Sequence, residues 1–135
     1  VRSMKVVDAT ASWTYASATF RQARGSAANQ LDYIQGVSED SIQVIANHNG
    51  YTTLQGQQMA TGIGIDSTTV DSAVLSPGNQ TLIAASWGGF QAYYQGYIAA
   101  GRHFLAWLEV SNASNGTFGG VQGTAKSGIM GSLLA

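Results

Sequence analysis

Glycine recurs along the whole chain while proline occurs once, and this spacing constrains the fold more than any other feature of the sequence. The 135 residues include 17 glycines and a single proline, Pro77. Turn residues recur at intervals of roughly 8 to 14 residues, a spacing typical of short antiparallel strands. No segment has the apolar period of about 3.6 residues that marks an amphipathic helix. The sequence therefore predicts about eight to ten strands, arranged as an all-β, antiparallel, jelly-roll-like β-sandwich.

Charged residues are scarce, and their scarcity excludes several classes of partner. Six residues are basic and seven are acidic, whereas an average soluble domain of this length would carry roughly 34 charged residues. With a net charge of −1, the chain lacks the positive field that holds nucleic acid or an anionic membrane. Neutral hydrogen-bonding groups must cover the surface, or part of the surface must be hidden against other chains.

Three absences narrow the class of protein further. The chain has no cysteine, which excludes a disulfide framework, thiolate zinc sites and cysteine nucleophiles. No apolar run approaches the roughly 18 residues of a membrane span, and no signal segment opens the chain, so we expect no membrane insertion. We expect one domain over residues 1–135, and the start at Val1 fits a terminal fragment of a longer chain.

The clearest strand pattern lies in the middle of the chain. Ile42, Val44 and Ala46 alternate with residues that would face the opposite side of a strand. The pair Asn49-Gly50 follows, and Asn-Gly is the strongest short-range hairpin signal because both central positions of a type I′ turn need positive φ. We therefore expect a turn at 49–50 and a strand that returns antiparallel over 52–58.

The most hydrophobic segment, residues 103–110, is apolar on both of its faces. Leu105 and Trp107 share one face with His103, while Phe104 and Leu108 share the other. Such a strand is either central in its sheet or has one face on a subunit interface. We assign His103, Leu105 and Trp107 to an oligomer interface.

Weaker patterns fill the rest of the chain. They combine β-branched and aromatic residues with flanking turn residues, as strands do. The first predicted strand starts at Val6, further strands cover 12–20, 31–36, 59–67, 81–87, 117–122 and 128–135, a loop covers 21–30, and turns lie at 38–41, 76–79 and 99–101.

Aromatic residues cluster between positions 87 and 97, and this segment is the best candidate for a ligand site. Aromatic rings can pack on the C–H groups of sugars, and amide side chains can hydrogen-bond sugar hydroxyls. The alternative is that these rings fill the core or a subunit interface. The predicted ligand-binding residues are Trp87, Phe90, Gln91, Tyr93, Tyr94, Gln95 and Tyr97.

The chain offers little acid–base chemistry. Its two histidines and seven carboxylates show no metal-ligand or nucleophile motif. Asp66 with Asp71, or Asp66 with Glu109, are the only carboxylate pairs to consider for glycoside hydrolysis. Asp66 and Asp71 also flank a loop, but the roughly six to eight ordered oxygen ligands of a calcium site are not evident. We therefore expect a protein that is not an enzyme, with no catalytic residues, no metal and no cofactor.

Four segments, in this order, carry a resemblance to a known family. They are FRQARGSAANQLDYIQG, ATGIGIDSTT, GRHFLAWLEVSNASNGTF and SGIMGS. Together they resemble a β-structured terminal domain of tailed-bacteriophage virion proteins. The resemblance implies a jelly-roll-like, usually trimeric domain at the exposed end of a fibre, spike or head-attached appendage. The chain departs from this pattern at Gly119-Gly120, where a more aromatic strand end is expected, and the resemblance brings no catalytic residues.

These observations favour a virion surface attachment module that binds a host-surface glycan or protein. The alternative is a capsid decoration or cement protein that stabilises the phage head, because burial between chains suits the same composition. Both hypotheses place the chain on the virion, with copies of itself and other virion proteins as partners. A polysaccharide hydrolase is a third hypothesis, limited by the few carboxylates.

Overall fold

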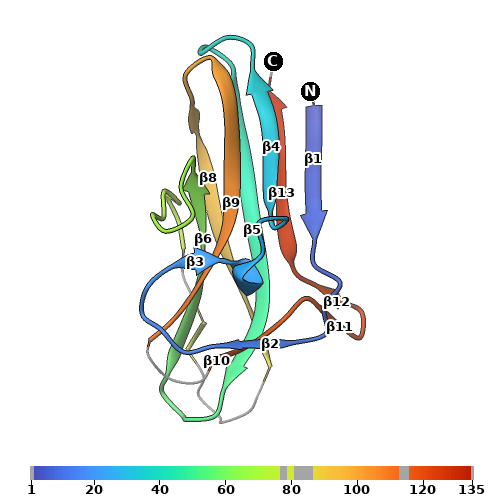
Figure 1. Ribbon diagram of the computed structural model, residues 1–135, viewed down its shortest axis with the longest axis vertical. Helices are drawn as coiled ribbons and strands as arrows, with labels where there is room; N and C mark the ends of the chain where they lie inside the picture. Colours follow the sequence, from blue (N-terminus) through green and yellow to red (C-terminus); the bar gives the residue numbers. More distant parts are fainter. Residues whose placement is uncertain (1, 77–78, 81–86, 113–115, 135) are drawn as a thin grey trace.

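The computed structural model describes residues 2–76, 79–80, 87–112 and 116–134 (Figure 1). Within these ranges the chain forms antiparallel strands, and its one helical element is a short 3-10 turn, η1 (Ala23–Gly25). The predicted all-β class is therefore confirmed. No helix in these ranges is long and apolar enough to cross a membrane. Parts of the predicted turn at 76–79 and of the predicted strand at 81–87 lie outside the described residues.

The first sheet has four long strands in the order β1-β13-β5-β8. The strand β5 lies at its centre, because β8 pairs with one edge of β5 while β13 and then β10 pair with the other. The short strand β2 extends the sheet beyond β10. The strands are β1 (Arg2–Val7), β2 (Trp13–Tyr15), β5 (Ser41–Thr52), β8 (Gly88–Tyr97), β10 (Gly116–Gly119) and β13 (Gly128–Leu134).

The second sheet follows the order β4-β9-β6-β7, with β3 beside the far part of β9. A separate small hairpin, β11 with β12, precedes β13. The strands are β3 (Arg21–Gln22), β4 (Gln30–Gln35), β6 (Gln58–Ile65), β7 (Asn79–Gln80), β9 (Gly101–Ser111), β11 (Val121–Gln122) and β12 (Ala125–Lys126).

The path of the chain between the two sheets is that of a jelly roll. The chain passes through β1, β4, β5, β6, β7, β8, β9 and β13, and it crosses between the sheets at every step except β6 to β7. The resulting facing orders, β1-β13-β5-β8 and β4-β9-β6-β7, are a sandwich of two Greek keys. The predicted jelly-roll-like sandwich is therefore confirmed, and the predicted trimer stays a prediction. The first and last long strands, β1 and β13, lie side by side (Figure 1).

The core forms where alternate residues of both sheets meet. Ile42, Val44 and Ala46 of β5 are fully buried, as their alternation predicts. They pack against Leu105 and Trp107 of β9 in the larger of two apolar clusters. The smaller cluster joins Met59, Phe90 and Phe118.

The predicted hairpin at Asn49-Gly50 is wrong. β5 continues through both residues to Thr52, and β6 then joins the other sheet. Gly50 serves close packing here, because a Cβ atom on it would lie 2.6 Å from Met59 Cε and 2.8 Å from the carbonyl oxygen of Thr117. The Asn-Gly pair therefore marks a crowded strand position instead of a turn.

The predicted oligomer interface on β9 also needs correction. Leu105 and Trp107 are fully buried inside the chain, so neither is available to a partner. β9 is the central strand of its sheet, with β4 and β3 on one side and β6 on the other. This central position explains why the segment is apolar on both faces. His103, the third residue of the predicted interface, binds within the chain to Asp66 and Ala99.

Several predicted boundaries shift. The strand predicted at 12–20 is limited to β2, and the loop predicted at 21–30 contains β3 and η1. The strand predicted at 117–122 is divided between β10 and β11, because the chain leaves the first sheet after Gly119. The strands predicted at 31–36, 59–67, 103–110 and 128–135 correspond to β4, β6, β9 and β13.

Candidate functional site

The pleat of β8 divides the predicted ligand-binding residues into two groups. Phe90 is buried in the smaller core cluster, and Tyr94 packs against the larger one, so both rings belong to the inside of the sandwich. The residues on the opposite side of β8 keep access to solvent, and Tyr97 is 70% exposed. This outward row consists of Gln91, Tyr93, Gln95 and Tyr97.

Trp87, the seventh predicted residue, lies just before β8. Its side chain is 43% exposed. Its ring meets the ring of Tyr51 edge to face, with the centroids 4.7 Å apart. A hollow of about 390 Å³ opens beside it, lined in part by Asn49, Gly89 and Gln122. Trp87 therefore sits at the opposite end of β8 from Tyr97.

The outward row of β8 continues onto β5. Gln43, Ile45 and Asn47 stand directly opposite Gln95, Tyr93 and Gln91, respectively, in the strand pairing. The Tyr93 hydroxyl donates a hydrogen bond of 2.7 Å to Gln95 Oε1. Uncharged amides and phenol rings therefore cover two adjacent strands.

The same side of the sheet extends across β13 to β1. Met130 stands opposite Ile45 on one side and Lys5 on the other. We call the whole surface the outer face. It consists of Gln91, Tyr93, Gln95 and Tyr97 of β8, Gln43, Ile45 and Asn47 of β5, Met130 and Ser132 of β13, and Lys5 and Val7 of β1.

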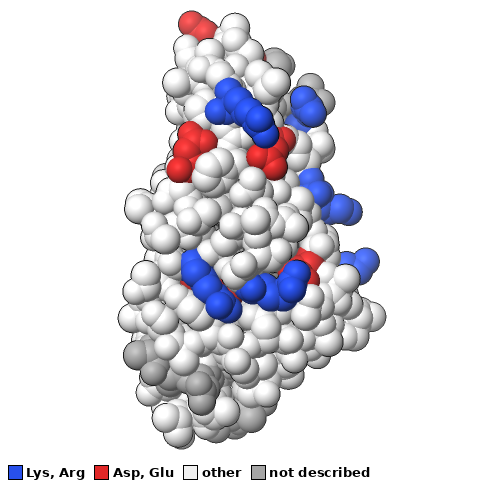
Figure 2. Space-filling model, viewed as in Figure 1, with Lys and Arg blue, Asp and Glu red and all other residues white. Residues whose placement is uncertain are grey.

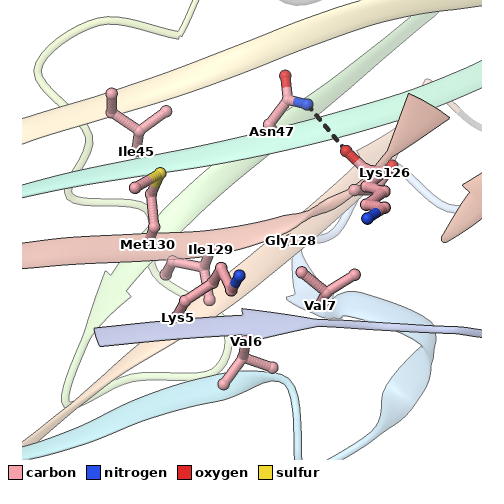
Figure 3. Close-up of a pocket in the computed structure, with 10 residues that line it drawn as sticks. Lys5, Val6, Val7, Ile45, Asn47, Lys126, Gly128, Ile129 and Met130 are labelled. Atoms are coloured by element: carbon pink, nitrogen blue, oxygen red, sulfur yellow. Dashed lines mark hydrogen bonds between the residues drawn. The ribbon is translucent and has the colours of Figure 1, made fainter. Parts of the chain in front are cut away.

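Two hollows lie along the middle of the outer face. The larger, of about 220 Å³, lies between β1, β5 and β13 (Figure 3). Ile45, Met130 and Val7 contribute apolar side chains to it, and Lys5 and Lys126 stand beside it. The smaller, of about 80 Å³, adjoins Gln43, Tyr93 and Ser132 and shares Ile45 and Met130 with the larger.

Charge is unevenly distributed over the molecule. None of β1, β5, β8 and β13 carries an Asp or Glu residue. Basic residues lie at the margin of the outer face: Arg2 and Lys5 on β1 and Lys126 on β12. In Figure 2, some of the blue atoms follow the right-hand edge, where β1 and β12 lie in Figure 1, and the red atoms lie nearer the middle, at the left and at the top. The outer face is therefore free of carboxylates and bordered by cations.

A buried polar cluster, which the sequence analysis did not predict, lies inside the sandwich around Glu109. This carboxylate is fully buried. Its four donors are Trp13 Nε1 at 2.8 Å, Arg21 Nε at 2.8 Å, the backbone N–H of Arg24 at 2.9 Å and His48 Nε2 at 3.2 Å. The donors come from β2, β3, η1 and β5, so Glu109 holds four elements to β9.

His48 completes this cluster as a neutral imidazole. It is fully buried, and its ring centroid lies 4.6 Å from that of Trp107, 4.7 Å from Phe118 and 5.4 Å from Phe90. Burial lowers the pKa of His48 below its usual 6.5, although the hydrogen bond to Glu109 opposes this shift. Its Nδ1 atom has no hydrogen-bond partner, which suits an unprotonated nitrogen. The saturated Glu109 and the enclosed ring give this cluster a structural role.

The carboxylates considered for hydrolysis or calcium binding are engaged in backbone and histidine contacts. Asp66 accepts hydrogen bonds from His103 Nδ1 at 2.7 Å and from the backbone N–H of Phe104 at 3.0 Å. Asp71 Oδ1 accepts from the backbone N–H groups of Ile63 and Ala73. Among the described residues, no group of three or more His, Asp or Glu side chains could hold a metal ion.

The pKa of His103 shifts in the opposite direction to that of His48. The Nε2 atom of His103 lies 2.7 Å from the carbonyl oxygen of Ala99, so both ring nitrogens face acceptors. The hydrogen bond to Asp66 raises the pKa of His103 above its usual 6.5. Burial acts to raise the pKa of Asp66, but its bonds to His103 and Phe104 outweigh that effect and lower it.

Comparisons with known proteins leave the family open. No family model matches the chain, and no curated protein matches it. Among solved structures, the chain is similar to one described as the EclA C-terminal domain, a sugar-binding protein. The match has 9% sequence identity and a TM-score of 0.43, and it covers 96% of this chain and 83% of that chain. These values are too low to assign a family or a ligand to this chain.

Proposed function

We propose that this chain is a non-enzymatic attachment module on the surface of a virion and that it binds a host-surface glycan through the outer face of β5 and β8. The observation that carries this proposal is the row of Gln91, Tyr93, Gln95 and Tyr97 on β8 beside Gln43 and Asn47 on β5. The virion assignment depends on the sequence resemblance. The glycan assignment depends on the chemistry of this row.

Neutral hydroxylated ligands match the groups that the row presents. A primary amide offers both donors and an acceptor, so one Gln side chain can bond two sugar hydroxyls. A phenol ring presents an apolar face for the C–H side of a sugar and a hydroxyl at its edge. Gln95 and Tyr97 offer these groups as neighbours on the same side of β8, with Tyr97 70% exposed.

Glycan arrays read with the purified chain test the proposal, because they show whether the chain binds sugars at all. We expect binding that falls at least tenfold in Tyr97→Ala and in Gln91→Ala. Ile34→Ala, on the other sheet, is the control for Tyr97, because Ile34 is 68% exposed. Gln55→Ala, in the exposed turn after β5, is the control for Gln91. Absence of glycan binding, or equal losses in the controls, would reject the proposal.

We also propose that the attachment module assembles as a homotrimer. Residues assigned to the core supply no interface, so the contact must use apolar side chains that remain exposed. Val70, Val74 and Leu75 are 61%, 57% and 65% exposed within one short segment. Light scattering should give three times the 14.1 kDa of one chain. A monomer at micromolar concentration would reject the trimer.

The same exposed segment favours a second candidate, a capsid decoration protein. Val74 and Leu75 form backbone hydrogen bonds with Tyr93 at the edge of β8 that does not pair with β5, so the apolar segment lies beside the sheet. An exposed apolar strip of this kind suits permanent contact with another virion protein. Copy number separates the candidates, since hundreds of copies per particle indicate decoration and a few dozen or fewer indicate a fibre or spike.

A further inference from the structure

We propose that the hollow between β1, β5 and β13 binds a carboxylate-bearing sugar, and that Lys5 and Lys126 select this sugar over neutral ones. The inference rests on the glycan-binding function proposed for the outer face, and it adds the charge class of the ligand. Its experiment is arranged so that the two proposals can fail separately.

The hollow has the size and lining of a site for a single sugar ring. Its volume of about 220 Å³ corresponds to about seven water molecules. Ile45, Met130 and Val7 line it with apolar groups, and Asn47 adds an amide (Figure 3). The Asn47 amide nitrogen donates to the Lys126 carbonyl oxygen at 3.2 Å, which ties the β12–β13 connection to β5.

A glycine keeps the strands that form the hollow close together. Gly128 lies on β13 between Val7 of β1 and Asn47 of β5 in the strand pairing. A side chain at this position would overlap the carbonyl oxygen of Val6. A side chain at residue 128 could therefore occupy the hollow only if β1, and Lys5 with it, moved away from β13.

The two lysines are available to a negatively charged ligand. No ion pair among the described residues involves Lys5 or Lys126. Asp8, the nearest carboxylate to Lys5 in sequence, accepts hydrogen bonds from Arg24 at 2.7 Å and Asn29 at 2.8 Å. Since the four strands of the outer face carry no carboxylate, an acidic ligand in the hollow would lie beside Lys5 and Lys126 without a carboxylate from these strands to compete with it. Charge-assisted hydrogen bonds of this kind are among the stronger polar contacts.

The position of the hollow favours a sugar acid over another anion. Ile45 and Met130 line both this hollow and the adjoining one, which carries Gln43 and Tyr93. A saccharide that lies across the row of amides and rings can thus place one ring in the larger hollow. The apolar side chains suit the C–H groups of that ring, and the lysines suit its carboxylate.

Isothermal titration of the wild-type chain with matched saccharides tests the inference. One arm compares an oligomer of hexuronic acid with its neutral hexose counterpart, and the other compares sialyl-lactose with lactose. The first arm detects a uronic acid within a polymer, and the second detects a terminal sialic acid. We expect about tenfold tighter binding of the acidic member in one arm at low salt, with the preference reduced at high salt.

Variants assign this preference to residues. Lys5→Gln and Lys126→Gln should each reduce the acidic preference, and the double variant should abolish it while neutral binding remains. Arg102→Gln on β9 removes one charge elsewhere and should keep the preference. Equal binding of acidic and neutral saccharides, or a preference that survives in the double variant, would overturn the inference and leave the proposed function standing.

Failure of the proposed function has a different signature. If no saccharide of either class binds the wild-type chain, glycan binding by the outer face is rejected, and the acidic subsite with it. If acidic saccharides bind through the lysines but Tyr97→Ala and Gln91→Ala have no effect, the subsite is supported, and the role proposed for the β8 row is rejected.

Discussion

The inner and outer faces of the sheet β1-β13-β5-β8 are built from alternate residues of the same strands, and they differ in almost every chemical property. On β5 the inner residues Ile42, Val44, Ala46 and His48 are fully buried. The residues between them, such as Gln43 and Asn47, reach the surface. The inner face is therefore fixed by packing against the second sheet, whereas the outer face is nearly free of packing constraints.

This difference shows how a sheet separates stability from recognition. Because successive side chains of a strand point to opposite sides, an outer residue can change without disturbing the core. On the inside of the sandwich, the Glu109 carboxylate is saturated by four donors. The outer face instead leaves amides, rings and two lysines accessible. Substitutions on the inner face should therefore change the free energy of unfolding, and substitutions on the outer face should change ligand binding.

The largest effect on stability is expected from Trp107→Ala. Trp107 is fully buried and donates to Thr61 Oγ1 at 3.1 Å, so its removal should cost about 3 to 5 kcal/mol. Trp13→Ala should cost less, because Trp13 is only partly buried. Urea unfolding of both variants measures the difference. Equal losses would show that the core is centred elsewhere.

Glu109→Gln should be the next most damaging change. The amide keeps the shape of the carboxylate, but its NH₂ group would face donors such as Trp13 Nε1 and Arg21 Nε. Loss of one partner of a buried ion pair costs about 3 kcal/mol or more. Asp32→Asn on β4 is the control, because Asp32 is exposed. A similar melting temperature for both variants would contradict the structural role of the Glu109 cluster.

Gly50→Ala tests the inner face at the position where the sequence suggested a turn. The added methyl group would meet Met59 and the backbone of Thr117, and overpacking of this kind costs about 1 to 3 kcal/mol. Gly36→Ala is the matched control, because a Cβ atom at Gly36 has nothing within 4 Å and the backbone φ there is not positive. If Gly50→Ala is as well tolerated as Gly36→Ala, β5 does not run through residue 50.

The two histidines should give stability opposite dependences on pH. The pKa of His48 is lowered from 6.5, so below pH 6.5 the unfolded chain binds a proton that the folded chain does not. Stability then falls by at most about 1.4 kcal/mol per pH unit. The pKa of His103 is raised from 6.5, so its contribution is full below pH 6.5 and is lost as pH rises through the folded pKa.

Unfolding free energies between pH 5 and pH 8 separate the two contributions. His48→Phe should reduce the loss of stability as the pH falls below 6.5. His103→Gln should reduce the loss of stability as the pH rises above 6.5. Asp8 and Asp66 have lowered pKa values, so their contributions decline only below pH 3.8, outside this range. A His48→Phe profile with the wild-type acidic slope would contradict a neutral buried imidazole.

The smallest effect on stability is expected on the outer face. Tyr97→Ala and Gln91→Ala should change the unfolding free energy by less than about 0.5 kcal/mol, because both side chains are exposed. Circular dichroism during thermal unfolding provides the measurement. A larger loss would mean that these residues support the fold, and the contrast between the two faces would then be lost.

Much of this architecture could be predicted from local patterns, and the failures have physical reasons. The alternation over Ile42–Ala46 predicts the inner face of β5 correctly, and the same period extended by two residues would have placed His48 in the core. Applied to β8, it would have separated Phe90 and Tyr94 from the outward row. The Asn-Gly signal misled because crowding, not turn geometry, requires glycine at residue 50.

Contacts between distant parts of the chain could not be predicted in this way. Glu109 contacts His48, which is 61 positions away in the sequence, and Arg21, which is 88 positions away. No local pattern predicts these partners. The pair Lys5 and Lys126 depends on β1 pairing with β13, which joins the two ends of the sequence. The apolar β9 segment was ambiguous because a central strand and an interface strand have the same composition.

The pairing of β1 with β13 has a practical consequence for experiments on this protein. Arg2 is the partner of Leu133, and both Leu134 and Tyr97 are partners of Ser41. A tag, label or solid support joined at either terminus therefore emerges near Tyr97 and far from Trp87. Immobilisation with a short spacer will block ligand access to the Tyr97 end of the sheet first. Surface-based assays therefore need a long spacer or attachment near residue 123.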